Sequence, residues 1–404
     1  MANEITIDFG TLNLDSTNNI AIAKISMQSK MSAKLSSIPQ ISGSIAETGK
    51  ITSMEISVSG DIAGTDYDDL RTNLDTLRAG FQNSFQKFTT DDDRYMMAQL
   101  VNFTYSFKAL RTIAEWKAKF VAHYPYWLSE TEHDNGTFMA NGNFEKWTAG
   151  AAVAPDGWAI VGVASSIARN AGPKVGTYCA ALTRAGTDCY MYPTTYATPP
   201  KGIAYYRGKV VTAGCWVYAT VASRVRIGIN DGVSATQYSS YHSGTPQWEW
   251  LTVTITVPVG ATQLYPLCAV DTGDTIGYFD GAVFEEGATA TEFTTDDITI
   301  NNAGNVPARI KIEVTPSVEM ADDCKIENTT TGKSFQHRGT VAISKVLEVD
   351  NRYDTDDFEV LNDSADDTVN FEGDFLTLDP GDNVLRLTST VGVLFRIKHK
   401  DTWY

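Results

Sequence analysis

Residues 54–81 read MEISVSGDIAGTDYDDLRTNLDTLRAGF, and this stretch decides the fold of the first unit. Apolar and polar residues alternate from Met54 to Val58, which predicts a strand with one buried face. After an acidic turn, apolar residues recur at helical spacing, at Leu70, Leu74, Leu77 and Phe81. Thr65 or Asp66 can cap that helix. The stretch therefore predicts a strand followed by a helix.

Two further alternating stretches follow this helix, at 101–107 and 116–120. They predict two more strands, so the first unit is an α+β domain built on long antiparallel ribbons. Ribbons of this kind bury one face within their own subunit and still have a strand edge to cover, commonly against a neighbouring subunit.

The rest of the chain predicts strands with short spacings and no long helix. Valine, leucine and isoleucine alternate with threonine over 251–257, and the pattern recurs at 225–229, as expected for a β-sandwich. A second set of alternating stretches lies at 310–314 and 391–397, after a change to a more acidic composition. We therefore expect a mainly β chain in three units, with boundaries at 1–138, 139–295 and 296–404.

Composition limits the function. The chain has 404 residues, 43% of them hydrophobic, and a formal net charge of −17. A basic face is needed to bind nucleic acid or an anionic membrane, so neither partner is expected. No secretory signal and no membrane-spanning apolar run is visible. The five cysteines have no metal-binding spacing, which favours reduced thiols over a disulfide in the middle unit.

Ordered motifs in the outer units resemble the siphophage distal-tail (Dit) family. The first unit does so through EISVSGDIAGTDYDDLRTNLDTLRAGF (55–81), DDDRYMMAQL (91–100) and AEWKAKFVAHYPYWL (114–128). The third unit does so through NNAGNVPARIKIEV (301–314), IENTTTGKSF (326–335) and DFLTLDPGDNVL (374–385). No single motif is highly specific for this family, but the combination of the motifs in this order is moderately specific for it.

This resemblance implies an α+β ring-forming N-terminal domain and a C-terminal galectin-like β-sandwich. It implies a homohexameric ring in the virion tail, assembled in the host cytoplasm. The ring would form the baseplate hub that connects the tail tube protein to the tail-tip and hub proteins. It implies no catalysis.

The middle unit sits where the family usually runs directly from one domain into the other. It resembles jelly-roll-like β-sandwiches of carbohydrate-binding modules, through NGNFEKW (141–147), PDGW (155–158) and YFDGAVFEEGATATEF (278–293). Such modules often hold a structural calcium, and calcium prefers oxygen ligands. Asn143, Glu145 and Asp280 would supply them if the first and last strands lie together. The simpler alternative is that Glu145 and Asp280 are solvated or cap a turn.

Aromatic residues of the middle unit are candidates for contact with a host-surface glycan, because sugar rings stack on aromatic faces. The candidates for the carbohydrate-binding patch are Trp248, Trp250, Tyr238 and Tyr241. Trp158 and Trp216 are expected in the core. Alternation places Trp248 and Trp250 on one face of a strand, either core or outward. If that face is the core, the tyrosines of 190–196 become the next candidates.

An enzyme is not expected. The five histidines are dispersed, and neither an HExxH nor a GxSxG motif occurs. A glycosidase would need two opposed carboxylates in a cleft, and the acidic residues of the middle unit are ordinary for a sandwich of that size. The predicted function is a virion structural protein with an accessory glycan-binding module for host adhesion. The alternative is a non-viral carbohydrate-binding protein of a polysaccharide-degrading system.

Overall fold

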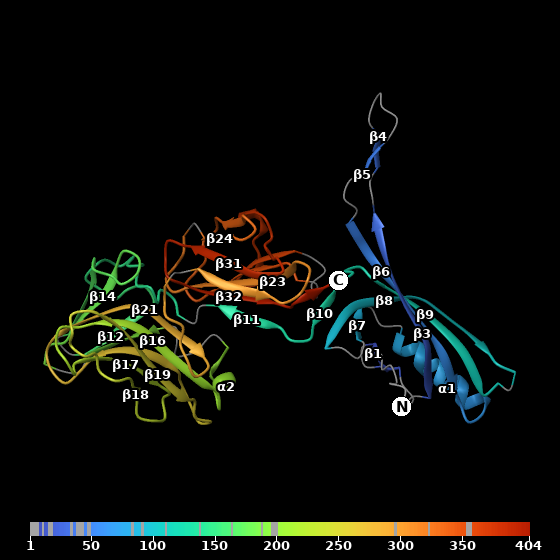
Figure 1. Ribbon diagram of the computed structural model, residues 1–404, viewed down its shortest axis with the longest axis horizontal. Coiled ribbons are helices and arrows are strands. Elements are labelled where there is room, and N and C mark those ends of the chain that lie inside the picture. The colour runs from blue at the N-terminus through green and yellow to red at the C-terminus, as the bar shows by residue number, and fades with distance from the viewer. Residues whose placement is uncertain are drawn as a thin grey trace.

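The computed structural model shows three bodies in a row, with the C-terminal unit between the other two (Figure 1). It describes residues 8–9, 12–14, 19–32, 35–37, 44–46, 50–81, 85–89, 93–109, 111–136, 139–162, 165–186, 189–194, 201–294, 297–321, 324–352 and 358–404. Strands dominate the described residues, so the expected mainly β class is confirmed. The expected unit boundaries at 138 and 295 lie outside the described residues.

The first unit is a nine-stranded antiparallel sheet in the order β2-β1-β7-β8-β9-β6-β3, with β10 and β33 joined to it beside β8. Its strands are β1 Asp8–Phe9, β2 Leu12–Asn13, β3 Ile20–Ser32, β6 Lys50–Ala63, β7 Gln86–Thr89, β8 Arg94–Phe107, β9 Ile113–Ala122, β10 Trp127–Ser129 and β33 Thr402–Trp403. The predicted helix is α1, Tyr67–Phe81, and its four apolar residues are buried against the sheet. Asp66 caps it, because its Oδ1 accepts a hydrogen bond of 2.9 Å from the Asp69 amide.

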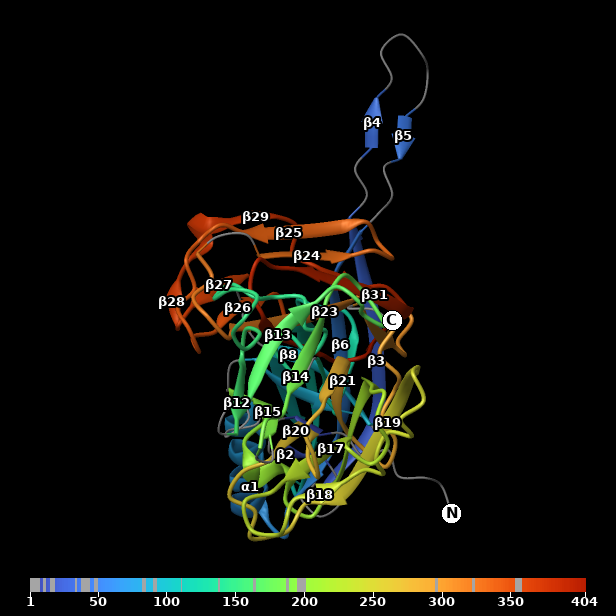
Figure 2. The ribbon, with the colours of Figure 1, turned by 90° about the vertical axis from the view of Figure 1, so that its left-hand side faces the viewer.

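Besides the two-residue β2 at one end, two long strand edges of this sheet are open among the described residues. β3 is the last strand of the sheet, and β7 covers β8 only over Tyr95–Ala98. The remaining half of β8, from Gln99 to Phe107, pairs with β9 on one side only. The β3–β6 ribbon continues toward the short pair β4 (Leu35–Ser37) and β5 (Ser44–Ala46), which stands clear of the other elements (Figure 2).

The middle unit is a sandwich of two five-stranded antiparallel sheets. One, called sheet A here, has the order β13-β14-β21-β16-β19, and the other, sheet B, has the order β12-β15-β20-β17-β18. Sheet A contains β13 Ser166–Asn170, β14 Cys179–Thr183, β16 Val210–Tyr218, β19 Trp248–Thr256 and β21 Ile276–Glu286. Sheet B contains β12 Trp158–Val161, β15 Cys189–Pro193, β17 Val225–Asn230, β18 Gln237–Tyr238 and β20 Tyr265–Val270. One short helix, α2 (Ile203–Tyr206), accompanies them.

A single hydrophobic core lies between these two sheets. Leu251, Val253 and Ile255 of β19 point into it, opposite Ile227 and Cys268 of sheet B. The five cysteines are all buried, and none of them is in a disulfide.

The C-terminal unit is a second sandwich with its own core. One sheet has the order β22-β31-β24-β25-β29, and the other β11-β32-β23-β26-β27-β28, with β30 beside β23. Their bounds are β11 His133–Gly136, β22 Ile298–Asn302, β23 Ala308–Pro316, β24 Cys324–Asn328, β25 Lys333–His337, β26 Leu347–Asp350, β27 Glu359–Asn362, β28 Ala365–Asp366, β29 Phe371–Gly373, β30 Thr377–Leu378, β31 Gly381–Thr388 and β32 Val393–His399. A 3₁₀ turn covers Thr368–Asn370.

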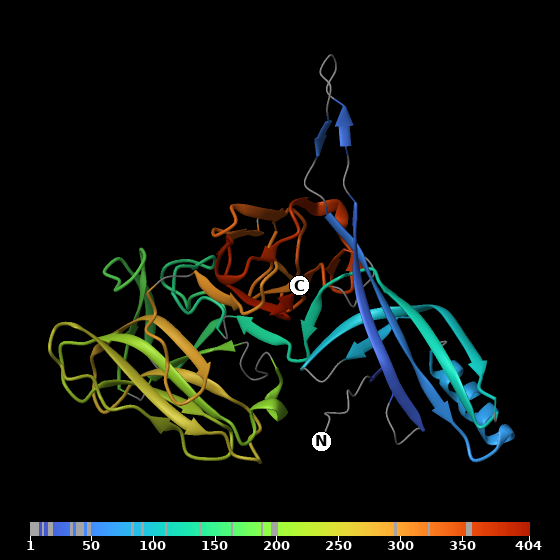
Figure 3. The same ribbon diagram turned by 45° about the vertical axis from the view of Figure 1, so that its right-hand side comes forward.

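The first and last units are joined by exchanged strands. β11, which follows the first unit in the chain, pairs with β32 of the C-terminal sheet. In return β33, at the end of the chain, pairs with β10 of the first sheet. Figure 3 shows the chain end beside the strand that leaves the first unit. Among the described helices, none has the length and apolar character needed to cross a membrane.

Candidate functional site

Trp248 and Trp250 lie on the outer face of sheet A. The next residues of β19 that point inward are Leu251, Val253 and Ile255, so alternation sends both tryptophans the other way. In register across the sheet, Trp250 faces Trp216 and Trp248 faces Tyr218 of β16. The ring centroids are 5.3 Å apart in the first pair and 5.8 Å in the second. The sequence left open whether Trp248 and Trp250 face the core or point outward, and the structure places both on the outer face.

The expected core position of Trp216 is therefore wrong. Trp216 is half-buried on the outer face, because Cys215 and Val217 of β16 point into the core and alternation sends Trp216 the other way. Trp158 is buried as expected, at 5% exposure.

The chain segment that leaves the middle unit covers part of this tryptophan face. Trp216 Nε1 donates a hydrogen bond of 3.0 Å to the carbonyl of Phe293. The Trp250 ring lies so close to Gly214, beside Ala290, that no side chain fits at Gly214. On the other side, the Lys174 ammonium lies 4.3 Å from the Trp216 ring centroid. These contacts hold the half-buried rings of Trp216 and Trp250 in place with the chain's own residues.

Tyr238 of β18 and Tyr241, three residues after it, lie next to Arg226 of β17, on the side of sheet B. The guanidinium carbon of Arg226 is 3.7 Å from the Tyr238 ring centroid and 4.5 Å from that of Tyr241. Arg226 also forms an ion pair of 2.5 Å with Asp271. The four residues expected to form one patch therefore belong to two different sheets, and the structure does not bring them together as a single surface.

Three more tyrosines share the outer face of sheet B. Tyr192 packs against Tyr190 at 6.0 Å and against Tyr265 at 5.1 Å between ring centroids. In register, Tyr190 and Arg226 flank Ala269 of β20, so a small residue lies between two large ones. Burial, followed by the neighbouring tyrosines, raises the pKa of Tyr190 and of Tyr265, so both hydroxyls keep their protons.

We call Tyr190, Tyr192, Tyr238, Tyr241 and Tyr265, with Arg226, the tyrosine face. Tyr190 and Tyr192 were within the second cluster suggested by the sequence, and Tyr196 of that cluster lies outside the described residues. Tyr265 and Arg226 were missed. For Tyr190 and Tyr192 the signal in the sequence was the alternation in CYMYP (189–193), because it places both tyrosines on one face, opposite Cys189 and Met191.

Two of the three residues expected to bind calcium, Glu145 and Asp280, contact residues 174–178. Asp280 is fully buried on β21, and its Oδ2 accepts hydrogen bonds from the amides of Lys174 (2.7 Å) and Val175 (2.8 Å). Glu145 Oε1 accepts from the amides of Thr177 (2.6 Å) and Tyr178 (2.9 Å). Asn143 Oδ1 accepts from the Glu145 amide at 3.4 Å.

This arrangement fits a hard cation. The second carboxylate oxygen of Asp280 is buried and has no hydrogen-bond partner. Burial raises the pKa of Asp280 to about 7, and the charge of Glu145 adds to the rise. Two neighbouring carboxyl groups are the ligand type that calcium prefers. A bound calcium would offset the unfavourable burial of the Asp280 charge.

Other carboxylates of the middle unit are engaged in holding loops. Asp156 accepts from the amide and hydroxyl of Thr148, and Asp231 from the amides of Val233 and Ser234. Glu249 accepts from the Ser243 amide. These contacts give such acidic residues a structural role.

The chain is similar to tail proteins of phages. Residues 303–403 match the family described as siphovirus-type tail component, C-terminal domain. The crystal structure of the Dit protein of phage SPP1, described as a paradigm of hub adsorption apparatus in phages that infect Gram-positive bacteria, is 10% identical. The alignment covers 99% of each chain, with a TM-score of 0.48. The expected resemblance to the siphophage distal-tail family is confirmed, with the sequence match confined to the C-terminal unit.

Two other solved structures are similar at lower scores. A chain of the phage P2 baseplate in its activated conformation with calcium is 10% identical over 98% of both chains, with a TM-score of 0.36. A tandem of two CBM22 domains from Xyn10C of Paenibacillus barcinonensis is 8% identical, over 68% of this chain and 99% of that one, with a TM-score of 0.28. No curated protein matches the sequence.

Proposed function

We propose that this chain is a structural subunit of a phage tail, at the baseplate hub that joins the tail tube to the tail tip. The observation that carries the proposal is the match of residues 303–403 to the siphovirus tail-component domain. The strand exchange supports it, because β11 and β33 tie that domain to the first sheet. The match also disfavours the alternative of a non-viral polysaccharide-degrading system.

The first unit would close a ring of identical subunits, six by family resemblance. Its sheet has two open edges, β3 and the second half of β8, and a closed ring covers both without forming a filament. Apolar side chains lie exposed beside the β8 edge: Val101 is 54% exposed and Tyr105 48%. A second copy of this chain is the partner that would pair with these open strand edges.

Light scattering and electron microscopy of the purified chain test the ring. Six subunits in a closed ring are expected. Val101→Lys places a charge at the covered edge and should dissociate the ring, whereas Val259→Lys, at a residue 79% exposed in the middle unit, should not. The proposal would be overturned if the purified chain were strictly monomeric and also absent from isolated tail tips.

The middle unit would contact host-surface glycan through the tyrosine face. Its rings are partly exposed, and Arg226 and the tyrosine hydroxyls lie beside them to meet sugar hydroxyls, with the buried Asp271 holding Arg226 in place. Covering roughly 100 Å² of ring is worth about 2.5 kcal/mol before ordering costs. A single site would then bind on the order of millimolar. Several copies on one ring would make weak sites effective.

Retention on host cells tests this contact. Purified rings of the wild type should sediment with host cells or with their isolated wall polysaccharide, and the double variant Tyr192→Ala, Tyr265→Ala should stay in the supernatant. Tyr278→Ala, on sheet A, is the matched control. Equal retention of all three proteins would show that the tyrosine face is not the glycan contact, while leaving the hub proposal intact.

We further propose that Asn143, Glu145 and Asp280 hold a structural calcium. The ion would join the start of the middle unit to β21 and to residues 174–178, since these three parts supply or position the oxygens. The proposal rests on the unpartnered, buried oxygen of Asp280. Its role would be to stabilise the sandwich.

A further inference from the structure

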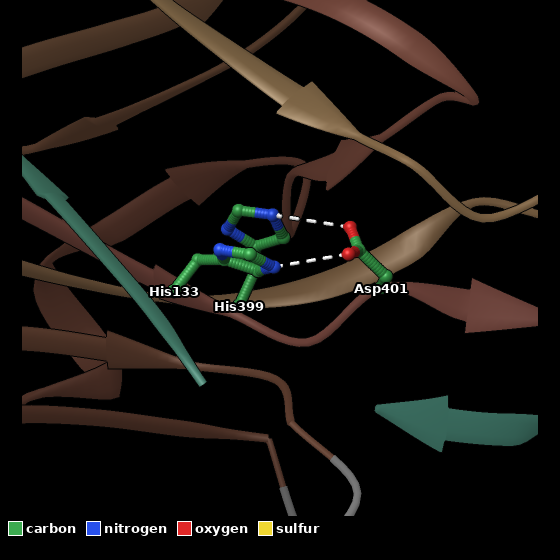
Figure 4. A group of neighbouring side chains, drawn as sticks. All are labelled: His133, His399 and Asp401. Atoms are coloured by element: carbon green, nitrogen blue, oxygen red, sulfur yellow. Dashed lines mark hydrogen bonds and ion pairs between the residues drawn. The ribbon is translucent and has the colours of Figure 1, made fainter. Parts of the chain in front are cut away.

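Two histidines and an aspartate converge where the first and last units meet. His133 of β11 and His399 of β32 are direct cross-strand partners, and their rings stack with centroids 4.8 Å apart. Asp401 follows His399 by two residues, and its carboxylate lies at the edge of both rings (Figure 4). His133 Nε2 is 2.9 Å from Asp401 Oδ2, and His399 Nε2 is 3.7 Å from Oδ1.

Within the described residues this is the only group of three or more His, Cys, Asp or Glu side chains whose ligand atoms all lie within 4.8 Å. Its two inner members are fixed. The His399 side chain is 1% exposed and that of Asp401 9%, and Asp401 Oδ1 accepts a hydrogen bond of 2.8 Å from the Ala303 amide. An orienting contact of this kind is typical behind a metal-binding carboxylate.

His133 is the member that is free to adjust, because its side chain is 42% exposed. It borders a cavity of about 460 Å³ on the surface, lined by Ser129, Thr131, Asp401 and Trp403 among others. The cavity gives an ion and its remaining water ligand a path to the site. His399 Nε2 donates a hydrogen bond of 3.1 Å to the carbonyl of Asn301, so a metal ion on this nitrogen would replace its proton.

We propose that His133, His399 and Asp401 bind a divalent transition metal of the zinc class. Imidazole nitrogens and one carboxylate suit zinc, whereas calcium prefers oxygen ligands alone. Ligand atoms around tetrahedral zinc lie roughly 3.3 Å apart, given metal–ligand distances of about 2.0–2.2 Å. The two distances from the histidine nitrogens to Asp401, 2.9 and 3.7 Å, bracket that spacing, and the exposed His133 ring is the ligand that would adjust to it.

Such an ion would fix the strand that links the two outer units. β11 leaves the first unit, pairs with β32 and leads into the middle unit, so a metal on His133 joins it to His399 and Asp401. The neighbouring polar residues already pair across the same junction: Asp134 binds Arg396, and Glu132 binds Arg352. The metal would thus set how the C-terminal unit is held against the ring domain, independently of any glycan contact.

Calorimetric titration with zinc chloride tests the site on the full chain, without a histidine tag and after treatment with a chelator. The wild type should bind zinc and melt at a higher temperature with it. His133→Ala should weaken binding at least tenfold at this site and remove the thermal shift, and Asp401→Asn should do the same. His123→Ala, at another exposed histidine, should leave both unchanged.

His133→Ala is the decisive variant, since an exposed side chain can be removed without unfolding the chain. Zinc binding that survives this substitution, or a wild type that binds no zinc, overturns the proposal. Binding that is lost in Asp280→Asn and kept in His133→Ala also overturns it, because the ion would then occupy the oxygen site of the middle unit. Calcium should compete poorly with zinc at the histidine site.

Discussion

The two sheets of the middle unit both carry aromatic rings on their outer faces, but the surroundings of those rings differ. On sheet A, Trp216 and Trp250 are held by the exit segment, through the Phe293 carbonyl and Ala290. On sheet B, the tyrosines pack against one another and against Arg226. Aromatic density alone therefore does not mark a binding surface. What matters is whether the chain's own segments already occupy the rings.

Among substitutions of aromatic residues, the largest effect is expected on the tryptophan face. Trp250→Ala should lower the free energy of unfolding by about 3 kcal/mol, because it leaves a cavity between Trp216, Gly214 and the exit segment. Cell retention of the surviving folded protein should be unchanged. Thermal melts and a cell pull-down measure the two quantities. A variant of normal stability that no longer binds cells would reverse the assignment of the two faces.

Asp280 offers a pH test of the region beside the tryptophan face. Its pKa is raised from 3.8 to about 7, so without calcium its stabilising contribution is complete below pH 4 and is lost as pH rises through 7. Since one pH unit is worth about 1.4 kcal/mol, the loss is on the order of 4 kcal/mol. Melts at pH 5 and pH 8 in a calcium chelator should show about 3 kcal/mol of it, because the loss has already begun below pH 5.

Asp280→Asn should flatten that pH dependence, because the amide resembles the protonated carboxyl and does not titrate. Calcium should raise the melting temperature of the wild type at pH 8 and leave the variant unchanged. Equal melting of the wild type with and without calcium would argue against the calcium site.

A matched pair of glycines sharpens the comparison. Gly214 lies beneath Trp250 and Gly228 beneath Tyr238, and a side chain at either would meet the ring above it. Gly214→Ala should cost about 2 kcal/mol, because Trp250 is clamped and cannot move aside. Gly228→Ala should cost less, since Tyr238 is 37% exposed at the edge of its sheet. Denaturant melts of both variants give the difference, and a larger cost at Gly228 would contradict this account.

The smallest effect on stability is expected at the tyrosine face. Tyr238→Ala should cost about 1 kcal/mol or less, from the lost contact with Arg226. Its effect on glycan binding should be the larger one, as a several-fold drop in cell retention. A loss of more than about 3 kcal/mol in the free energy of unfolding would show that Tyr238 stabilises the fold as a core residue does.

Local patterns in the sequence determined a good part of this protein. Helical spacing gave α1 and its buried residues, and alternation gave β6, β9 and the common direction of Trp248 and Trp250. These properties depend on backbone geometry within a few residues, which is why the sequence carries them.

Only the tertiary structure determined which residues the faces of these strands and of the helix contact. Alternation could not say that Trp248 and Trp250 point outward, nor that Tyr238 and Tyr241 belong to the opposite sheet, because sheet membership depends on pairing between distant strands. The same holds for the junction, where His133 meets Asp401 across 268 positions of sequence. Such meetings follow from how β11 and β32 pair, and no local propensity encodes that pairing.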